Sequence, residues 1–350
     1  MIGASLTVDG MIYKGWTALQ AVGAIDAIAG EFAVSAEQAG DIMIYPGASA
    51  VLKLENQTVC SGYISRTAAN LSADDCGLTL GGADKTVDLA ECSVMAEPDE
   101  WFNLTLCEIA IKLCAPFKIK VVNQVGDTGE AFKSFKIQPG ESVFDALDRA
   151  AKARAVLATS DEAGNLVLTR AGLNGTAESL IYGENILEAA FSADWSNRFS
   201  DYTVKNQTSL IDDTQESANA TGTSRDLNVK RYRPLLQVVQ NAEAGVSVSD
   251  MAAWEACVRS GCCAGINITV QGWTQSDGVL WRKNTLSRVS IPRWGVDAKL
   301  LIKQVVFSLD KAGAKTKLTL VSPDAYKRLP VVQKSKDESG LLPPDAIEIK

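Results

Sequence analysis

The chain has 350 residues, of which 46% are hydrophobic and 22% charged, and its formal net charge is −8. A chain of this length can bury a core but exceeds the usual size of a single one, so we expect a globular protein of two to four domains. The 34 basic and 42 acidic residues are mixed along the chain, which argues against a surface that binds nucleic acid or anionic lipid.

Two further features of the composition narrow the chemistry. The sequence contains no histidine, which removes the commonest general base and the commonest transition-metal ligand. Its eight cysteines are too dilute for a disulfide framework and form no C-x-x-C motif, so we expect buried free thiols and neither a metal nor a cofactor. The N-terminus lacks the features of a secretory signal, and no apolar stretch approaches the roughly 18 residues of a membrane span. These features predict a protein made and kept in the cytoplasm.

Residues 1–96 show the pattern of a first β domain. Short apolar runs alternate with turn residues, which is typical of a small antiparallel barrel or sandwich. The runs are 12–13, 32–34, 42–45, 51–54 with a hairpin to 64, and 78–80.

Residues 97–185 predict a compact α+β unit. A first helix is expected from the acidic turn around Pro98 to Pro116. Its apolar stripe is Trp101, Leu104, Cys107, Ile111 and Cys114. A second helix is expected from Ser142, with Asp145 in its capping turn, to about Arg154, followed by strands at 155–158 and 166–168 around a turn at 161–164.

Residues 186–230 and 265–326 predict a second β domain, interrupted by a helical insertion at 231–264. The polar run 207–228 is expected to be a loop. The inserted helix is expected to be capped by Ser249 and Asp250 and to end at Gly261. Its buried stripe is Met251, Trp254 and Val258, and the later strands are 266–270, 286–291, 300–302, 305–309 and 318–321. Residues 327–350 are charged and contain proline, which indicates an extended arm. The fold class is therefore α+β, mainly β, with two barrel-like domains around an α+β unit.

Paired carboxylates are the strongest candidates for an enzyme. A glycosidase needs two carboxyl groups several ångströms apart, and neighbours such as Asp74-Asp75 and Asp99-Glu100 seldom provide that separation. A turn role suits the first pair and a helix-start role the second. A carboxylate pair that folding brings together from distant positions stays open, so a cell-wall hydrolase is the alternative function.

Three other motifs have two interpretations each. Cys262-Cys263 could bind a metal or face another subunit, and the absence of histidine disfavours the metal. The basic and aromatic run at 230–233 could contact nucleic acid, or it could be a surface strand or a subunit contact. Trp273, Trp281 and Trp294 could mark an interface or pack in a β core.

The order of short motifs along the chain resembles the Mu-like phage tail baseplate hub family, which also occurs in prophages. The similarity runs from about residue 5 to 326 and lies in the whole ordered set, because each motif alone is only a turn with an aromatic. The motifs lie at 15–16, 25–26, 30–32, 46–47, 61–64, 88–93, 140–147, 161–166, 197–202, 231–234, 254–255 and 270–284. One departure is Gly81-Gly82, where the family often has Gly-Arg.

The resemblance implies a structural role with no catalytic residue. The expected assembly is a homotrimer whose two barrel-like domains per subunit form a pseudo-sixfold ring. This ring would adapt the hexameric tail tube, among other baseplate proteins, to the trimeric membrane-piercing spike. The phage genome would pass through its lumen without specific binding, and the chain itself would not insert into a membrane. The residues expected to carry the family's architecture are Gly15, Trp16, Phe32, Gly62, Tyr63, Asp88, Leu89, Arg198, Tyr202, Trp254, Gly272, Trp273, Gly278, Trp281 and Asn284.

Overall fold

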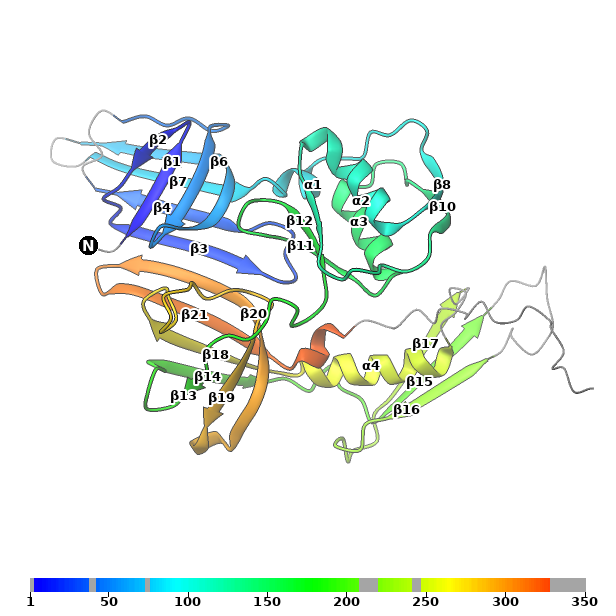
Figure 1. Cartoon of the computed structure of the whole chain (residues 1–350). Helices are drawn as coiled ribbons and strands as arrows, with labels where there is room; N and C mark the ends of the chain where they lie inside the picture. Colours follow the sequence, from blue (N-terminus) through cyan, green and yellow to red (C-terminus); the bar gives the residue numbers. More distant parts are fainter. Residues whose placement is uncertain (1–2, 38–41, 73–75, 208–219, 241–246, 328–350) are drawn as a thin grey trace, which may run out of the picture.

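The structure is a computed structural model that describes residues 3–37, 42–72, 76–207, 220–240 and 247–327. It confirms a mainly-β α+β chain, in which one thirteen-stranded sheet is accompanied by three small sheets and several helices (Figure 1). Among the described helices, none is long and apolar enough to cross a membrane. Figure 1 shows a helical unit beside the upper part of the large sheet and the long helix α4 beside its lower part.

The large sheet contains the same five-strand order twice. We call β3-β4-β7-β6-β5 the first repeat and β14-β18-β21-β20-β19 the second repeat. The strands of the first repeat are β3 (Ala18–Ala24), β4 (Glu31–Ala36), β5 (Ser49–Leu54), β6 (Gln57–Leu71) and β7 (Cys76–Asp84). Those of the second are β14 (Glu188–Ala193), β18 (Ala264–Gln271), β19 (Leu286–Ile291), β20 (Val296–Asp310) and β21 (Gly313–Val321).

The correspondence between the repeats extends to the register. β6 and β20 each have 15 residues and each form the long hairpin of their repeat, with β7 and β21. The β6–β7 register shifts between Ile64 and Arg66, and the β20–β21 register shifts between Ile302 and Gln304. In both repeats the first half of the long strand pairs with the preceding strand, β5 or β19. A β-bulge inserts one residue and re-aims the strand beyond it, so each long strand can serve two neighbours.

The two repeats are joined edge to edge by β3 and β20. Residues 304–309 of β20, beyond the bulge, pair antiparallel with residues 19–24 of β3. The described strands therefore form one continuous open sheet, and the expected pair of separate barrel-like domains is corrected to this extent. The sheet also contains β1 (Ala4–Val8), β2 (Met11–Tyr13) and β13 (Leu180–Ile181).

One apolar core serves both repeats. It contains Phe32 and Leu80 from the first repeat and Ile268, Phe307 and Leu318 from the second, all buried. Full burial of such a side chain contributes about 1.5–3 kcal/mol relative to leaving it exposed. Joining the sheets therefore gains a shared core as well as backbone hydrogen bonds.

The α+β unit lies between the repeats in sequence. Its helices are α1 (Val87–Glu91), α2 (Leu106–Cys114) and α3 (Val143–Lys152), with a 3-10 turn at Ala115–Phe117. Its strands are β8 (Glu100–Leu104), β9 (Val121–Asn123), β10 (Phe132–Lys136), β11 (Leu157–Ser160) and β12 (Leu166–Thr169). The α3 prediction is confirmed, since the Ser142 hydroxyl accepts a hydrogen bond from the Asp145 amide and the helix begins and ends close to the predicted residues. Its buried face consists of Val143, Ala146, Leu147, Ala150 and Ala151. The turn between β11 and β12 is also as predicted.

The prediction for α2 was wrong in its start and its buried face. The acidic segment around Glu100 opens strand β8, which pairs with β10, and the helix begins only after Thr105, which forms a capping box with Glu108. Ile111 is 54% exposed, and the buried face carries Leu106, Ile109, Ala110 and Leu113 together with Cys114, which is buried as predicted. The reciprocal cap supplies a stronger helix start than the acidic turn.

The region around α4 (Val248–Cys262) also differs from the prediction. β15 (Asp201–Gln207), β16 (Thr221–Arg225) and β17 (Pro234–Gln240) form a sheet of their own, so residues 186–230 do not all join the second β region and 231–264 is not purely helical. The expected loop 207–228 contains β16, while 208–219 and the arm at 328–350 lie outside the described residues. The two remaining 3-10 turns are Pro292–Trp294 and Pro323–Tyr326.

The ends and stripe of α4 need correction as well. Ser247, and not Ser249, caps the helix by accepting a hydrogen bond from the Asp250 amide. The fully buried positions are Val248, Ala252, Ala256 and Gly261, while Met251, Trp254 and Val258 are only half-buried. The small residues face the neighbouring elements closely, as a Cβ on Gly261 would lie 2.3 Å from the Ala325 amide nitrogen. Packing distance thus decided which face is buried.

We predict that Gly62→Ala destabilises the first repeat. A Cβ at Gly62 would lie 2.0 Å from the Ala83 carbonyl oxygen on β7, so the β6–β7 pair must separate. We expect a loss of about 1–3 kcal/mol in unfolding free energy, the usual range for overpacking, measured by denaturant unfolding. Gly265→Ala is the control, because its Cβ would meet its nearest atom at 3.5 Å. Equal unfolding midpoints for the two variants would contradict the prediction.

Candidate functional site

Lys283 is a buried lysine that links the two repeats and the α+β unit. Lys283 lies in the corner at 270–284 of the second repeat, and its ammonium donates to the Ala24 carbonyl oxygen at 3.2 Å at the end of β3. It also donates to the Thr159 hydroxyl at 3.0 Å and the Ser160 hydroxyl at 3.4 Å, both on β11 of the α+β unit. One side chain thus spans the second repeat, the first repeat and the α+β unit.

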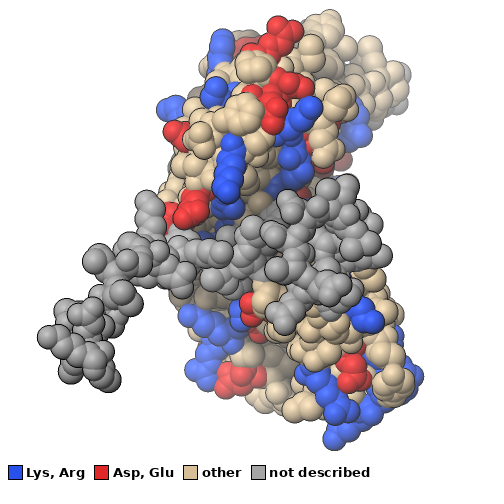
Figure 2. Space-filling model, turned by 90° about the vertical axis from the view of Figure 1, so that its right-hand side faces the viewer, with Lys and Arg blue, Asp and Glu red and all other residues tan. Residues whose placement is uncertain are grey.

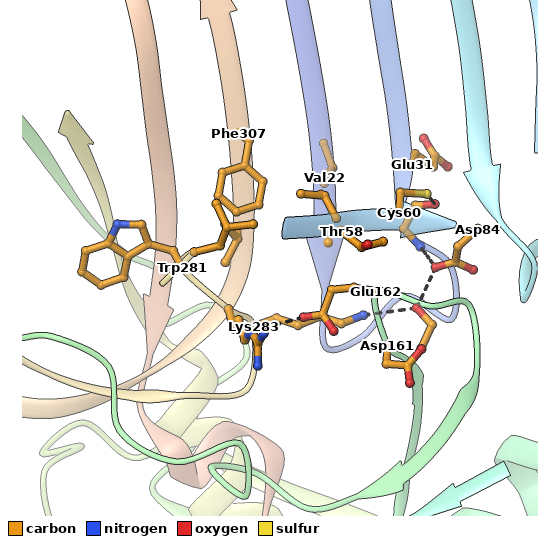
Figure 3. Close-up of a pocket in the computed structure, with 17 residues that line it drawn as sticks. Val22, Glu31, Thr58, Cys60, Asp84, Asp161, Glu162, Trp281, Lys283 and Phe307 are labelled. Atoms are coloured by element: carbon orange, nitrogen blue, oxygen red, sulfur yellow. Dashed lines mark hydrogen bonds and ion pairs between the residues drawn. The ribbon is translucent and has the colours of Figure 1, made fainter. Parts of the chain in front are cut away.

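Asp84 completes this arrangement from the end of β7. Its carboxylate accepts hydrogen bonds from the Ser160 hydroxyl at 2.8 Å and from the Gly30 amide at 2.6 Å. The Thr86 amide donates to its other oxygen at 2.9 Å. Figure 3 shows Lys283 and Asp84 at this junction, and Ser160 hydrogen-bonds to both of them. We call Ala24, Asp84, Thr159, Ser160 and Lys283 the junction cluster.

Burial controls the ionisation of the groups at the junction. Desolvation lowers the pKa of Lys283, against the attraction of Asp84 and the more distant acidic residues, which raises it. Burial also raises the pKa of the nearby Cys60 thiol, helped by the negative charge of Asp84, so this thiol is neutral. A neutral buried thiol is a poor nucleophile and metal ligand. Cys60 therefore behaves as an apolar core residue.

A cavity of about 50 Å³ lies beside the junction cluster. Its lining includes Val22, Trp281, Val305 and Phe307 as well as Asp84, Ser160 and Lys283 of the junction cluster (Figure 3). The volume has room for a few water molecules. The Trp281 indole nitrogen is buried and has no hydrogen-bond partner among the described residues. The polar groups of the junction cluster bond to one another, so the arrangement is suited to holding the repeats together.

The corner at 270–284 fixes the same junction from further positions. Asn284, with φ +62, accepts the Gly172 amide at 2.7 Å and donates to the Arg170 carbonyl oxygen at 3.0 Å. The Gly278 carbonyl oxygen accepts from the Gln57 amide of the first repeat at 2.8 Å. Trp273 is buried and its indole donates to the Ser308 carbonyl oxygen at 3.0 Å. Gly272 adopts φ +74, which only a residue without a Cβ adopts without strain.

A second buried ionic cluster lies where the β15–β17 sheet leaves the second repeat. Arg198 forms an ion pair with Asp226 at 2.7 Å and donates to the Cys263 sulfur at 3.3 Å. Burial alone would raise the pKa of Asp226, but hydrogen bonds from Arg198 and Asn228 outweigh it and lower that pKa. The Tyr202 hydroxyl, also buried, accepts from the Phe199 amide at 3.0 Å.

The remaining expected residues lie apart from the junction. Phe32 and Leu89 are buried in two different apolar cores, Trp16 is packed at the edge of the first, and Gly15 beside it has φ +91. Asp88 is in the first turn of α1, and the Trp254 indole bonds the Lys327 carbonyl oxygen. Gly62 lies in the close β6–β7 contact, and its neighbour Tyr63 is 38% exposed. The predicted residues of the corner at 270–284 therefore lie together near the junction, whereas the other predicted residues lie at separate places in the fold.

Sequence reasoning missed Asp84, Ser160 and the role of Lys283. Lys283 lies in the corner segment at 270–284, but a lysine between an arginine and an asparagine gives no local indication that it is buried. Lysine and aspartate are almost never fully buried unless paired, and the partners here lie far away in sequence. The one feature of the sequence that could have indicated this site is the concentration of turn and aromatic residues around Lys283.

The other candidate motifs have local structural partners. The Cys262 thiol contacts the Ala325 carbonyl oxygen, and no metal-ligand cluster occurs within the described ranges. Arg233 donates to the Trp195 and Ser196 carbonyl oxygens. Asp74-Asp75 lies outside the described residues. Basic and acidic side chains are interspersed on the face in Figure 2, which shows no uniformly basic surface there.

Comparison with known proteins shows which protein families this chain is similar to. Three family models match successive parts of the chain. They are the N-terminal domain of Mu phage baseplate assembly protein GpP-like proteins at residues 4–84, the second domain of baseplate hub gp44-like proteins at 86–170, and the fourth domain of Mu phage baseplate assembly protein GpP at 245–328. Together with the duplicated sheet, these matches define a phage tail baseplate component.

Full-length relatives give the particular family. Baseplate hub protein gp44 of Escherichia phage Mu is 33% identical over 96% of this chain and 92% of its own length. The 43 kDa tail protein of prophage MuSo2 from Shewanella oneidensis is 31% identical, with a TM-score of 0.84 over 93% of this chain and 99% of that one. A tail protein from Neisseria meningitidis MC58 shares the fold, with a TM-score of 0.79 and 24% identity over 92% of this chain and 98% of that one. The chain belongs to the Mu-like phage baseplate hub protein family.

We predict that the unfolding free energy of the wild type minus that of Lys283→Met increases with pH. Burial lowers the pKa of Lys283 below its ordinary value of 10.5 in the folded chain. Between that lowered pKa and 10.5, the unfolded chain binds a proton that the folded chain does not, so wild-type stability rises with pH relative to the variant. Denaturant unfolding from neutral pH to about pH 10 tests this, and other titrating groups cancel in the difference.

Lys311→Met, at an exposed turn position, is the matched control and should show no such slope. Parallel stability curves for the wild type and Lys283→Met would contradict the assignment of Lys283 as a buried, desolvated lysine.

Proposed function

We propose that the chain is the subunit of a homotrimeric hub ring that adapts a hexameric tail tube to a trimeric membrane-piercing spike. The observation that carries this proposal is the duplicated five-strand unit, joined edge to edge through β3 and β20. Three copies of a chain with two such units supply six similar units around a threefold axis. A ring of this kind can present sixfold-like contacts on one side and threefold contacts on the other.

The proposed partners follow from this position in the tail. They are other copies of the chain, the spike, the tail tube and further baseplate proteins, and the ring would be assembled in the host cytoplasm and carried in the virion tail. The genome would pass through the lumen without specific binding. The net charge of −8 supports this part, because a protein poor in basic patches does not retain DNA.

A non-enzymatic role is part of the same proposal. The buried polar groups at the junction bond to each other and lie beside a cavity of about 50 Å³, which is far smaller than a site for a polysaccharide or peptide. The relative from phage Mu is named as a baseplate hub protein. The alternative is a tail-associated peptidoglycan hydrolase that uses a carboxylate pair.

We predict that the purified chain forms a trimer in solution. Multi-angle light scattering at several concentrations should give about 112 kDa, three times the chain mass of 37.3 kDa. If the chain alone gives a lower mass, addition of the spike should produce a complex with three copies of this chain. A strict monomer under both conditions would contradict the ring.

We predict that the chain releases no soluble fragments from purified peptidoglycan. Lysozyme serves as the positive control in the same turbidity and fragment-release assay. Release of fragments that is abolished by changing one Asp or Glu to its amide would favour the hydrolase.

A further inference from the structure

The small sheet of β15, β16 and β17 has one covered face and one open face. α4 packs against the covered face, where Val204, Val248 and Ala252 form a small buried cluster (Figure 1). The opposite face carries Leu236 and Val238 of β17, which are 57% and 54% exposed. Adjoining apolar side chains that are exposed and rimmed by polar residues mark an interaction site.

The strand register shows which other side chains share the open face. Thr203 of β15 lies between Leu236 of β17 and Thr223 of β16. Lys205 lies opposite Val238, two residues further along each strand. Because alternate residues of a strand point to the same face, these side chains form one surface. We call this surface the outer face, and it consists of Thr203, Lys205, Thr223, Arg225, Leu236 and Val238.

The outer face lies in a basic part of an acidic chain. Residues 198–207 and 220–240 contain six basic and two acidic side chains, a net charge of +4, whereas the whole chain has −8. Both acidic side chains form ion pairs with arginine, Asp226 at 2.7 Å and Asp201 at 3.5 Å. The exposed basic residues are Lys205, Arg225, Lys230 and Arg231. An occupant that complements this face is therefore acidic as well as apolar.

The C-terminal arm contains a segment of that composition. Residues 337–348 read Asp-Glu-Ser-Gly-Leu-Leu-Pro-Pro-Asp-Ala-Ile-Glu, with four acidic and no basic side chains. The large apolar residues of this segment are Leu341, Leu342 and Ile347. Residues 208–219 are acidic too, but they connect β15 to β16 at the end of the sheet opposite Arg225. The arm has no such second attachment.

The arm starts close enough to reach the outer face. The Trp254 indole on α4 donates to the Lys327 carbonyl oxygen at 2.5 Å. The next residue of α4, Glu255, accepts a hydrogen bond from the Gln237 side chain of β17 at 3.3 Å. Lys327 therefore lies beside the strand that carries the exposed apolar pair. The roughly ten residues from there to position 337 span about 33–36 Å when extended, whereas three strands are only about 10 Å across.

We propose that residues 337–348 dock on the outer face of the β15–β17 sheet of their own chain. The leucines and the isoleucine would cover Leu236 and Val238, and the carboxylates would lie near Lys205, Arg225 and the basic loop. Burial of the apolar pair and the attraction between opposite charges both favour this contact, and salt weakens the second. The docking involves one copy of the chain and does not depend on the proposed ring.

The docked segment would exclude other polyanions from the same face. The loop between β16 and β17 combines Lys230 and Arg231 with Tyr232, which is 80% exposed. Basic side chains beside an exposed aromatic ring are the composition of a nucleic-acid contact without sequence preference. An acidic segment on the same chain is present at a high effective concentration, so it keeps this face free of nucleic acid.

Labelling of an engineered thiol tests whether the segment covers the outer face. In the full chain with Val238→Cys, the thiol at 238 should react with a maleimide roughly tenfold more slowly than in the same chain with a charge-reversed arm, which corresponds to about 1.4 kcal/mol. The charge-reversed arm carries Asp337→Lys, Glu338→Lys, Asp345→Lys and Glu348→Lys. High salt should raise the rate with the wild-type arm, and peptide mass spectrometry separates this thiol from the native cysteines. Equal rates with both arms would overturn the proposal.

Two control variants are matched to the labelling experiment. Ala312→Cys places a thiol at the exposed turn between β20 and β21, where the arm charges should not change the rate. Reversal of the acidic side chains between β15 and β16, by Asp212→Lys, Asp213→Lys and Glu216→Lys, should leave the rate at 238 unchanged. A rate that rises with this reversal and not with the charge-reversed arm would assign the face to that connection, against the proposal.

Zero-length cross-linking shows which chain supplies the segment. A carbodiimide joins a lysine amine to a carboxylate in direct contact, so Lys205 and Lys230 should be linked to residues 337–348 in the wild type. In a sample reassembled from equal amounts of unlabelled and nitrogen-15 chains, each linked peptide pair should carry a single isotope. Mixed-isotope pairs would show docking on another copy and overturn the assignment to the same chain.

Another occupant of the outer face gives a different result. Slow labelling at 238 that appears only after a DNA oligonucleotide or the spike is added would assign the face to that partner and refute the docking. A chain that stays monomeric alone and with the spike would refute the proposed ring, and the labelling and single-isotope links would still decide the docking.

Discussion

The pairing of β3 with β20 organises the whole molecule. Residues 304–309 of β20 lie beyond a bulge that frees them from β19, and the backbone hydrogen bonds of this half-strand are completed by residues 19–24, almost 300 positions earlier. Because a buried strand edge must be hydrogen-bonded, the two repeats cannot separate without exposing both backbone edges and the shared apolar core.

The junction cluster adds specificity to this pairing. A sheet edge alone fixes register but does not fix how the α+β unit sits against it. Lys283 hydrogen-bonds both to Ala24 and to β11, and Ser160 on β11 also donates a hydrogen bond to Asp84. Buried charged groups contribute little net stability, but an arrangement that leaves one of them unpaired is strongly disfavoured. The cluster therefore selects one relative placement of the three parts.

Glycine positions show how backbone approach shapes the first repeat. At Gly82 a Cβ would lie 2.5 Å from the Phe32 ring and 2.5 Å from the Tyr63 carbonyl oxygen. The space that a side chain at this position would need is taken by Phe32. At the neighbouring Gly81, the Arg66 guanidinium lies 3.4 Å from where a Cβ would be. An arginine therefore does lie on this face of the sheet in this chain, but it comes from β6.

The sequence by itself determined the local elements whose signals are local. The capped helix α3, the turn at 161–164 and several strands, such as β4, β5, β18, β19 and β21, were predictable, because capping, turn chemistry and alternation act over a few residues. The strands β1, β3 and β14 were not predicted. The ordered motifs likewise indicated the family. Only the tertiary structure decided that β20 serves two neighbours, that Ile111 faces outward and that Lys283 is buried, because partners distant in the sequence determine each of these. Pairing between segments distant in the sequence produces no periodic pattern in either segment, so the sequence alone does not predict it.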